Sequence, residues 1–117
     1  MTGNIDATIR AALLLNANHL LLSAIKARRS GLPEYLPESF EQGAAAYVGL
    51  YHKYNTVDVW HDTKQAWGVD EWTQVETALM QMKEHEAKPY YRQRALDMVR
   101  FRLDFAEQNA EEEAIQW

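Results

Sequence analysis

Hydrophobic residues between Ile5 and Ala27 fall on two sides of the first predicted helix. At about 3.6 residues per turn, one side holds Ile5, Ile9, Leu13, Leu20 and Ala24. A second side holds Leu14, Leu21 and Ile25, close to Leu15 and Leu22. Only a narrow strip with Thr8, His19 and Lys26 is polar. Because a helix with two apolar sides must bury both, this helix is predicted to be the centre of a helical domain or half of a protein–protein interface.

The same pattern predicts about five helices. The first ends near Arg29, because Gly31 provides a stop, and a loop follows over 30–38. The others are predicted from about Pro37 to Tyr54, over 57–67, from 71 to about 87, and from Pro89 to about Ala114. Residues 47–62 also permit a β-hairpin, because their aromatic and β-branched side chains fit strands.

We therefore expect one all-α domain over residues 1–117, in which the long first and last helices form a spine surrounded by three shorter ones. Apolar residues of the last helix recur at spacings of three and four, which is typical of a coiled-coil seam. Any apolar strip left exposed on these two helices predicts a homodimer. The expected contacts are Leu14, Leu21 and Ile25, or else Leu96, Val99 and Leu103.

Charge and composition narrow the classes of protein. The chain has no cysteine, which excludes disulfides, thiolate metal sites and a thiol nucleophile. The net charge is −5, with basic segments over residues 1–29 and 88–106 and acidic segments over 30–87 and 107–117. This segregation favours ion pairing between packed helices over an acidic surface for a basic partner. Polar residues interrupt the first apolar run, so we expect no signal peptide, no membrane span and a cytoplasmic protein.

Aromatic residues concentrate in the middle of the chain, beside acidic ones. Tyrosine and tryptophan are enriched at interface hot spots, although they are also common in cores. The predicted partner-binding surface comprises Tyr51, Tyr54, Asp58, Trp60, Asp62, Trp67, Asp70 and Glu71. For one or two of the tryptophans, a position in the core is favoured over one at the surface. For Arg92 and Arg102, on the apolar arc of the last helix, we expect internal ion pairs or a pocket for an anion.

A metal site is the main chemical alternative. Asp58, His61 and Asp62 share one side of a helix, and His52 lies upstream. The favoured interpretation is that these are solvated surface residues, because the spacing is common and the chain has neither HExxH nor the paired ExxH motif of di-iron bundles.

These observations predict a small acidic non-enzymatic protein without a cofactor. It would bind and block or modulate a larger protein, as inhibitors, immunity proteins, antitoxins and viral anti-defence proteins do. One alternative is a small metal-dependent helical enzyme that uses His52, Asp58 and His61. Another is a helix-turn-helix regulator, but the overall acidity argues against a nucleic-acid partner.

Overall fold

The computed structural model describes residues 3–56 and 67–115. Within these ranges the chain forms four helices and no strand: α1 (Gly3–Arg29), α2 (Tyr35–Thr56), α3 (Val69–Met80) and α4 (Pro89–Ile115). The all-α prediction is confirmed, with four described helices instead of about five. Residues 47–56 are helical, which removes the first half of the alternative hairpin. The helix predicted over 57–67 falls on residues outside the described ranges, apart from Trp67.

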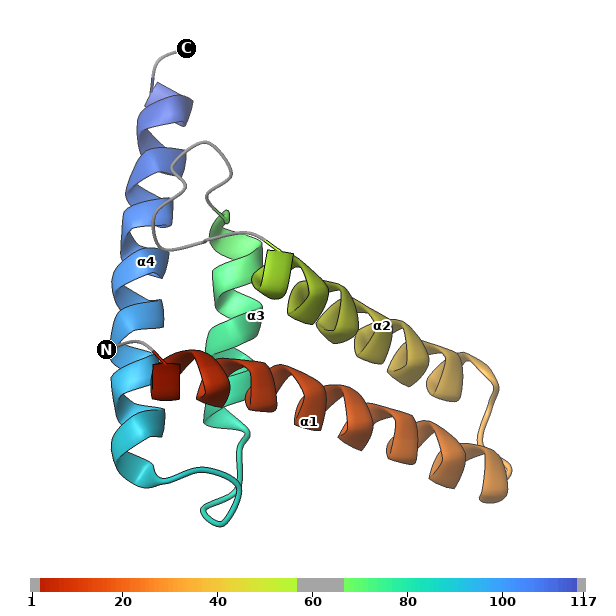
Figure 1. Cartoon of the computed structure of the whole chain (residues 1–117). Coiled ribbons are helices and arrows are strands. Elements are labelled where there is room, and N and C mark those ends of the chain that lie inside the picture. Colours follow the sequence, from red (N-terminus) through yellow and green to blue (C-terminus); the bar gives the residue numbers. More distant parts are fainter. Residues whose placement is uncertain (1–2, 57–66, 116–117) are drawn as a thin grey trace.

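The helices form two antiparallel hairpins, α1 with α2 and α3 with α4, which cross at an angle (Figure 1). Short connections make chain neighbours pack side by side. The expected spine of first and last helix is therefore not the main packing arrangement. The part of α1 up to about His19 lies against the α3–α4 hairpin, and the rest of α1 is paired with α2 (Figure 1).

The turn between α1 and α2 is set by Gly31, as the sequence predicted. Gly31 has a φ of 70°, in the left-handed region that favours glycine. Its N–H donates to Arg28 O at 3.1 Å, and the N–H of Leu32 donates to Ala27 O at 3.1 Å. These two bonds form a Schellman motif, which satisfies the last carbonyls of α1 and reverses the chain toward α2.

The hydrophobic core lies where the two hairpins cross. Ile9 and Leu13 of α1, Val75 and Leu79 of α3, and Val99 of α4 are completely buried there. The side of α1 predicted from Ile5, Ile9 and Leu13 therefore faces the core. One of the two apolar sides of α1 is thus accounted for by the fold of the single chain.

Beyond the crossing, the far part of the α1–α2 hairpin projects as an arm (Figure 1). The radius of gyration is 16.0 Å and the extents are 49 × 40 × 22 Å. A compact domain of this length has a radius of gyration of about 13 Å. The arm, which packs on neither α3 nor α4, and the C-terminal end of α4, which extends beyond α3, both contribute to this excess (Figure 1).

The helix α3 ends at Met80, about seven residues before the predicted end. Its last carbonyls are taken by side chains from other helices. Asn16 Nδ2 donates to Ala78 O at 3.0 Å, and Arg92 donates from Nε to Leu79 O at 2.8 Å and from its terminal nitrogen to Met80 O at 3.0 Å. Arg92 therefore caps a helix. The sequence had predicted an ion pair or an anion pocket for Arg92, but its observed hydrogen bonds are to backbone carbonyls.

Candidate functional site

The outer side of α1 is an exposed apolar face along the arm. Leu14, Leu21, Leu22 and Ile25 are between 42% and 46% exposed, although each is a large aliphatic residue. They point away from the core side of α1 described above. The helix α1 therefore has the two apolar sides that the sequence predicted. One side is buried in the core, and the other is exposed in the single chain.

The inside of the arm is built from small residues. Its buried side chains include Ala17, Ala24 and Ala27 of α1 and Ala44 of α2. Gly43 also lies close to α1, since a Cβ at this position would come within 3.1 Å of Leu20 Cδ1. Small side chains let the two helices approach closely. As a consequence, large aliphatic side chains of α1 in the arm are turned outward, and Leu21, Leu22 and Ile25 remain 44–46% exposed.

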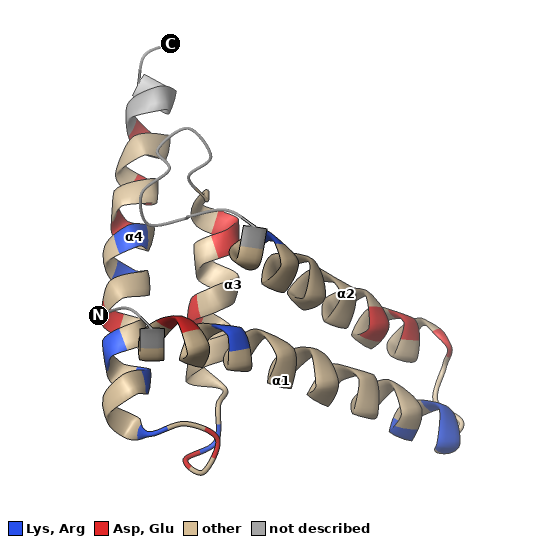
Figure 2. Cartoon of the chain, viewed as in Figure 1, with Lys and Arg blue, Asp and Glu red and all other residues tan. Residues whose placement is uncertain are grey.

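Charges are placed at the ends of the arm and not along its outer face. In Figure 2 the part of α1 between Arg10 and Lys26 carries no charged residue. At the tip, Arg28 pairs with Glu34 at 2.9 Å and also with Glu41. Hydrogen bonds to these carboxylates raise the pKa of Arg28, and Glu41 has the larger effect. The outer face is therefore uncharged over most of its length.

The helix α1 is also long and apolar enough, by length and composition, to cross a membrane over Asn4–Arg29. It is the one such helix among the described residues. The observed packing uses its inner side for the core, with Ile9 and Leu13 completely buried.

A second exposed face lies on α4 and contains two phenylalanines. Phe101 is 70% exposed and Phe105 is 54% exposed. The exposed carboxylates Asp97 and Asp104 lie on the same side of the helix as Phe101, at i−4 and i+3. This face is both aromatic and acidic. The sequence signal for it was the wide apolar arc of the last helix, on which these phenylalanines lie beside the buried seam.

The predicted seam of α4, in contrast, belongs to the core. Leu96, Val99 and Leu103 are buried against the other helices and belong to the same hydrophobic cluster as Ile9 and Leu79. They are not available for a contact between two folded copies. Of the two homodimer contacts expected from the sequence, only the set Leu14, Leu21 and Ile25 is exposed.

The aromatic residues of the predicted partner-binding surface are largely internal. Trp67 is 3% exposed and packs between Tyr54, at 5.8 Å between ring centroids, and Trp72, at 5.0 Å. Tyr54 is itself buried, and its hydroxyl donates to the Asp6 carboxylate. These aromatic contacts pack the end of α2 against the start of α3. Trp67 is thus a core residue, which agrees with a core position for one or two tryptophans. Tyr54 is also a core residue, so its prediction as a surface contact was wrong.

The remaining predicted contact residues do not form a patch in the described part of the chain. Tyr51 is half-buried and Asp70 is exposed. The Glu71 carboxylate accepts a bond from the N–H of Gly68 at the start of α3 and lies 3.6 Å from Lys53 Nζ. Glu71 therefore has a structural role. Asp58, Trp60 and Asp62 lie outside the described residues.

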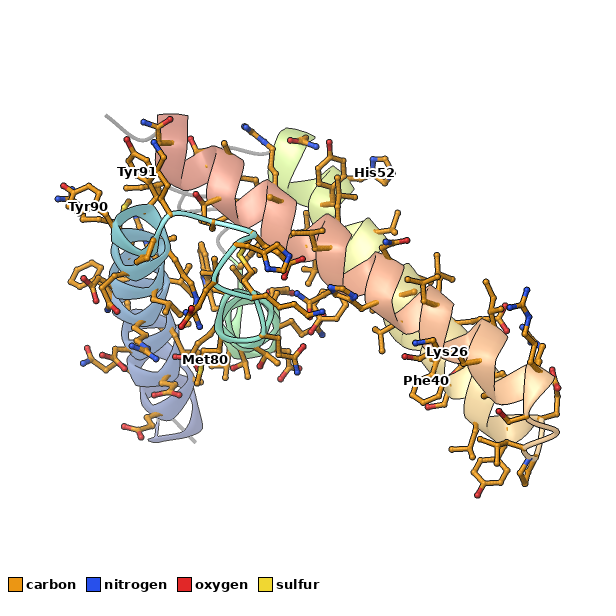
Figure 3. All side chains as sticks on the ribbon, turned by 90° about the horizontal axis from the view of Figure 1, so that it is seen from below. Lys26, Phe40, His52, Met80, Tyr90 and Tyr91 are labelled. Carbon is orange, nitrogen blue, oxygen red and sulfur yellow. The ribbon has the colours of Figure 1, made fainter. Side chains whose placement is uncertain are left out.

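The metal alternative finds no support among the residues that the structure describes. No group of three or more metal-ligating side chains occurs there. His52 is exposed on α2 (Figure 3), where it contacts the ring of Tyr51 at 5.6 Å between centroids. Asp58 and His61 fall outside the described ranges, so His52 is the one member of the predicted ligand set whose position is described.

The segregated charges form pairs between neighbouring elements, as the sequence favoured. Arg28 of basic α1 pairs with Glu34 and Glu41 of the acidic segment 30–87, and Arg100 of the basic segment 88–106 pairs with Glu76 of α3 at 3.1 Å. His19 Nε2 lies 3.5 Å from Glu86 Oε2 in the turn before α4. These pairs are at least partly exposed, so each contributes modestly to stability.

Comparison with protein-family models, with curated proteins and with solved structures finds no match to this chain.

Proposed function

We propose that this chain is a small acidic, non-enzymatic protein that binds a larger protein and blocks or modulates it. The observation that carries the proposal is the exposed aromatic face of α4, with Phe101 and Phe105 uncovered. A soluble monomer rarely leaves several large apolar residues together at its surface unless they serve an interaction. Burial of aromatic side chains is also the main source of energy at interface hot spots.

The charges beside the phenylalanines indicate the kind of partner. Asp97 and Asp104 are exposed on the same side of α4, and the whole chain carries a net charge of −5. An apolar cleft with a basic rim would accommodate the two rings and neutralise the carboxylates. A phosphate backbone would be repelled by them.

The cations of α4 give little support to the nucleic-acid alternative. Arg92 donates to backbone carbonyls of α3, and Arg100 pairs with Glu76. Arg94 lies over the ring of Tyr90 at 5.9 Å, near the first turn of the helix. These arginines are engaged in three different places within the chain, so they do not present one basic stripe.

The test is affinity capture from cell extract with three baits: the wild-type chain, the double variant Phe101→Glu/Phe105→Glu, and Leu32→Glu. Leu32 is an exposed apolar residue in the α1–α2 turn, so its variant controls for a general effect of added charge. We expect a protein recovered by the wild type and by Leu32→Glu, but not by the double variant. Calorimetry with the purified partner would then measure the loss directly. Equal recovery by all three baits would contradict the proposal.

A further inference from the structure

The outer face of α1 is centred on a single polar residue, Asn18, which is exposed. On a helix, the neighbours of a residue on its own face lie three, four and seven positions away in both directions. For Asn18 these neighbours are all apolar: Leu15 and Leu21, Leu14 and Leu22, and Ala11 and Ile25. Ala7 continues the face by another turn. From Ala7 to Ile25 the face is about 27 Å long, or roughly five turns.

This face also has the spacing of a two-helix seam. Ala7, Ala11, Leu14, Asn18, Leu21 and Ile25 follow one another at alternating intervals of four and three. Such an apolar stripe along one side of a helix is typical of a helix that packs against another helix. The seam on the inner side of α4 is filled by the chain itself. On the outer side of α1, Ala11 and Leu15 are half-buried against the edge of the core. The other residues of the face are exposed: Ala7, Leu14, Asn18, Leu21, Leu22 and Ile25.

We infer that a second copy of this chain covers the outer face of α1, with the two α1 helices antiparallel and the two Asn18 side chains meeting at the twofold axis. This inference goes beyond the proposed function, because it concerns a different face of the molecule from Phe101 and Phe105. The two surfaces lie on separate helices, so one can fail its test while the other passes.

Asn18 is the first argument for a second copy as the occupant. An amide that is buried against an apolar partner loses its hydrogen bonds to water and gains none, which costs about 1–3 kcal/mol. A second copy supplies another amide at the same level by symmetry.

The sizes of the side chains decide the direction of pairing. The face carries alanines at its N-terminal end, Ala7 and Ala11, and Ile25 at its other end. Parallel helices would place small against small and large against large, so their separation would have to change along the seam. Antiparallel helices place Ala11 opposite Ile25 of the partner subunit, and Leu14 opposite Leu22 of the partner subunit. The combined bulk is then even, as a constant distance between helices requires.

The charges favour the same direction. Lys26, Arg28 and Arg29 follow the apolar face at the tip of the arm (Figures 2 and 3). Parallel pairing would gather these cations from both copies at one end, where like charges repel. Antiparallel pairing separates them to opposite ends of the seam. Between these ends, the face itself has no charge that would oppose association.

The test uses disulfide crosslinking, since the chain has no cysteine of its own. Single variants Asn18→Cys, Leu14→Cys and Leu22→Cys are purified and exposed to a mild oxidant, with Leu32→Cys as an equally exposed control outside the face. We expect rapid dimer formation by Asn18→Cys alone and by a mixture of Leu14→Cys with Leu22→Cys. Leu14→Cys alone and Leu32→Cys should remain largely uncrosslinked.

Three results would overturn the inference. Efficient crosslinking of Leu14→Cys alone would place the helices parallel. No preference for Asn18→Cys over Leu32→Cys would show that the face is not paired. A protein that does not crosslink, but cosediments with phosphatidylcholine vesicles and loses this binding with Leu21→Glu, would show that a lipid surface covers the face instead.

Discussion

Asn16 Nδ2 donates a hydrogen bond to Ala78 O at 3.0 Å, inside the protein, and so joins α1 to the last turn of α3. The same amide nitrogen also contacts Ala12 O at 2.8 Å within its own helix. Ala78 O belongs to the last turn of α3, where helices leave carbonyls without an internal partner. This one side chain thus helps to end α3 and holds the two hairpins at their crossing. The direction in which the arm and its outer face project follows from that crossing.

We predict that Asn16→Ala lowers the free energy of unfolding by about 1–3 kcal/mol, because the Ala78 carbonyl remains buried without a partner. Urea denaturation followed by circular dichroism measures the change. Asn109→Ala is the matched control, since Asn109 is exposed on α4 and the gain in helix propensity is the same. Equal stability of the two variants would show that the bond between the hairpins contributes nothing.

We expect substitution by alanine to have opposite effects on stability at Gly31 and at Gly49. Gly31→Ala places a Cβ at a φ of 70°, so we expect a loss of roughly 1 kcal/mol. Gly49 lies within α2, where an added Cβ would meet no atom within 4 Å, so Gly49→Ala should stabilise the protein by about 0.5–1 kcal/mol. Thermal unfolding of both variants checks the signs. A gain for Gly31→Ala would contradict the Schellman turn.

Trp67→Ala should destabilise the protein by about 3–5 kcal/mol, as removal of a buried aromatic side chain does. Trp67→Phe should cost much less, because the Trp67 indole N–H is buried without a hydrogen-bond partner among the described residues. Phe101→Ala, at a 70% exposed position, serves as the control and should change stability by less than about 0.5 kcal/mol. A small loss of stability on Trp67→Ala would contradict the position of Trp67 in the core.

Glu86 gives the protein a dependence on acid pH. Its carboxylate accepts a bond from the Lys83 N–H at 2.7 Å and faces His19, and these contacts lower the pKa of Glu86 below its ordinary value of 4.5. A lowered pKa means that the stabilisation is fully present above 4.5 and is lost as the pH falls through the lower folded-state pKa. Melting temperatures measured across this range should therefore fall less steeply for Glu86→Gln than for the wild type. Glu84→Gln, at an exposed position in the same turn, should follow the wild type.

The sequence predicted the elements of this fold better than their mutual arrangement. The spacing of apolar residues revealed α1, with both its apolar sides, because helical periodicity is a local property. Periodicity does not say which side faces the core, and here that depends on where α3 and α4 cross α1. The premature end of α3 was likewise hidden, because its caps come from Asn16 and Arg92, in other helices.

The candidate site was harder to predict, because core and interface use the same residues. Trp67 and Tyr54 were predicted as contact residues from their composition and neighbours, yet they are buried together beside Trp72. Leu14 and Leu96 looked equivalent as seam residues, but only Leu14 is exposed. The difference lies in tertiary packing, which the pattern along one helix does not contain.

The most direct test of α1 pairing is the molar mass of the purified chain in solution, measured by light scattering at low and high salt. We predict a dimer, with twice the chain mass of 13.6 kDa, at both salt concentrations, because the outer face of α1 is uncharged. Leu21→Glu should reduce the mass to that of one chain, while Leu32→Glu and Phe101→Glu should leave the dimer intact. A monomeric wild type, or a dimer that survives Leu21→Glu, would contradict the pairing of two α1 helices.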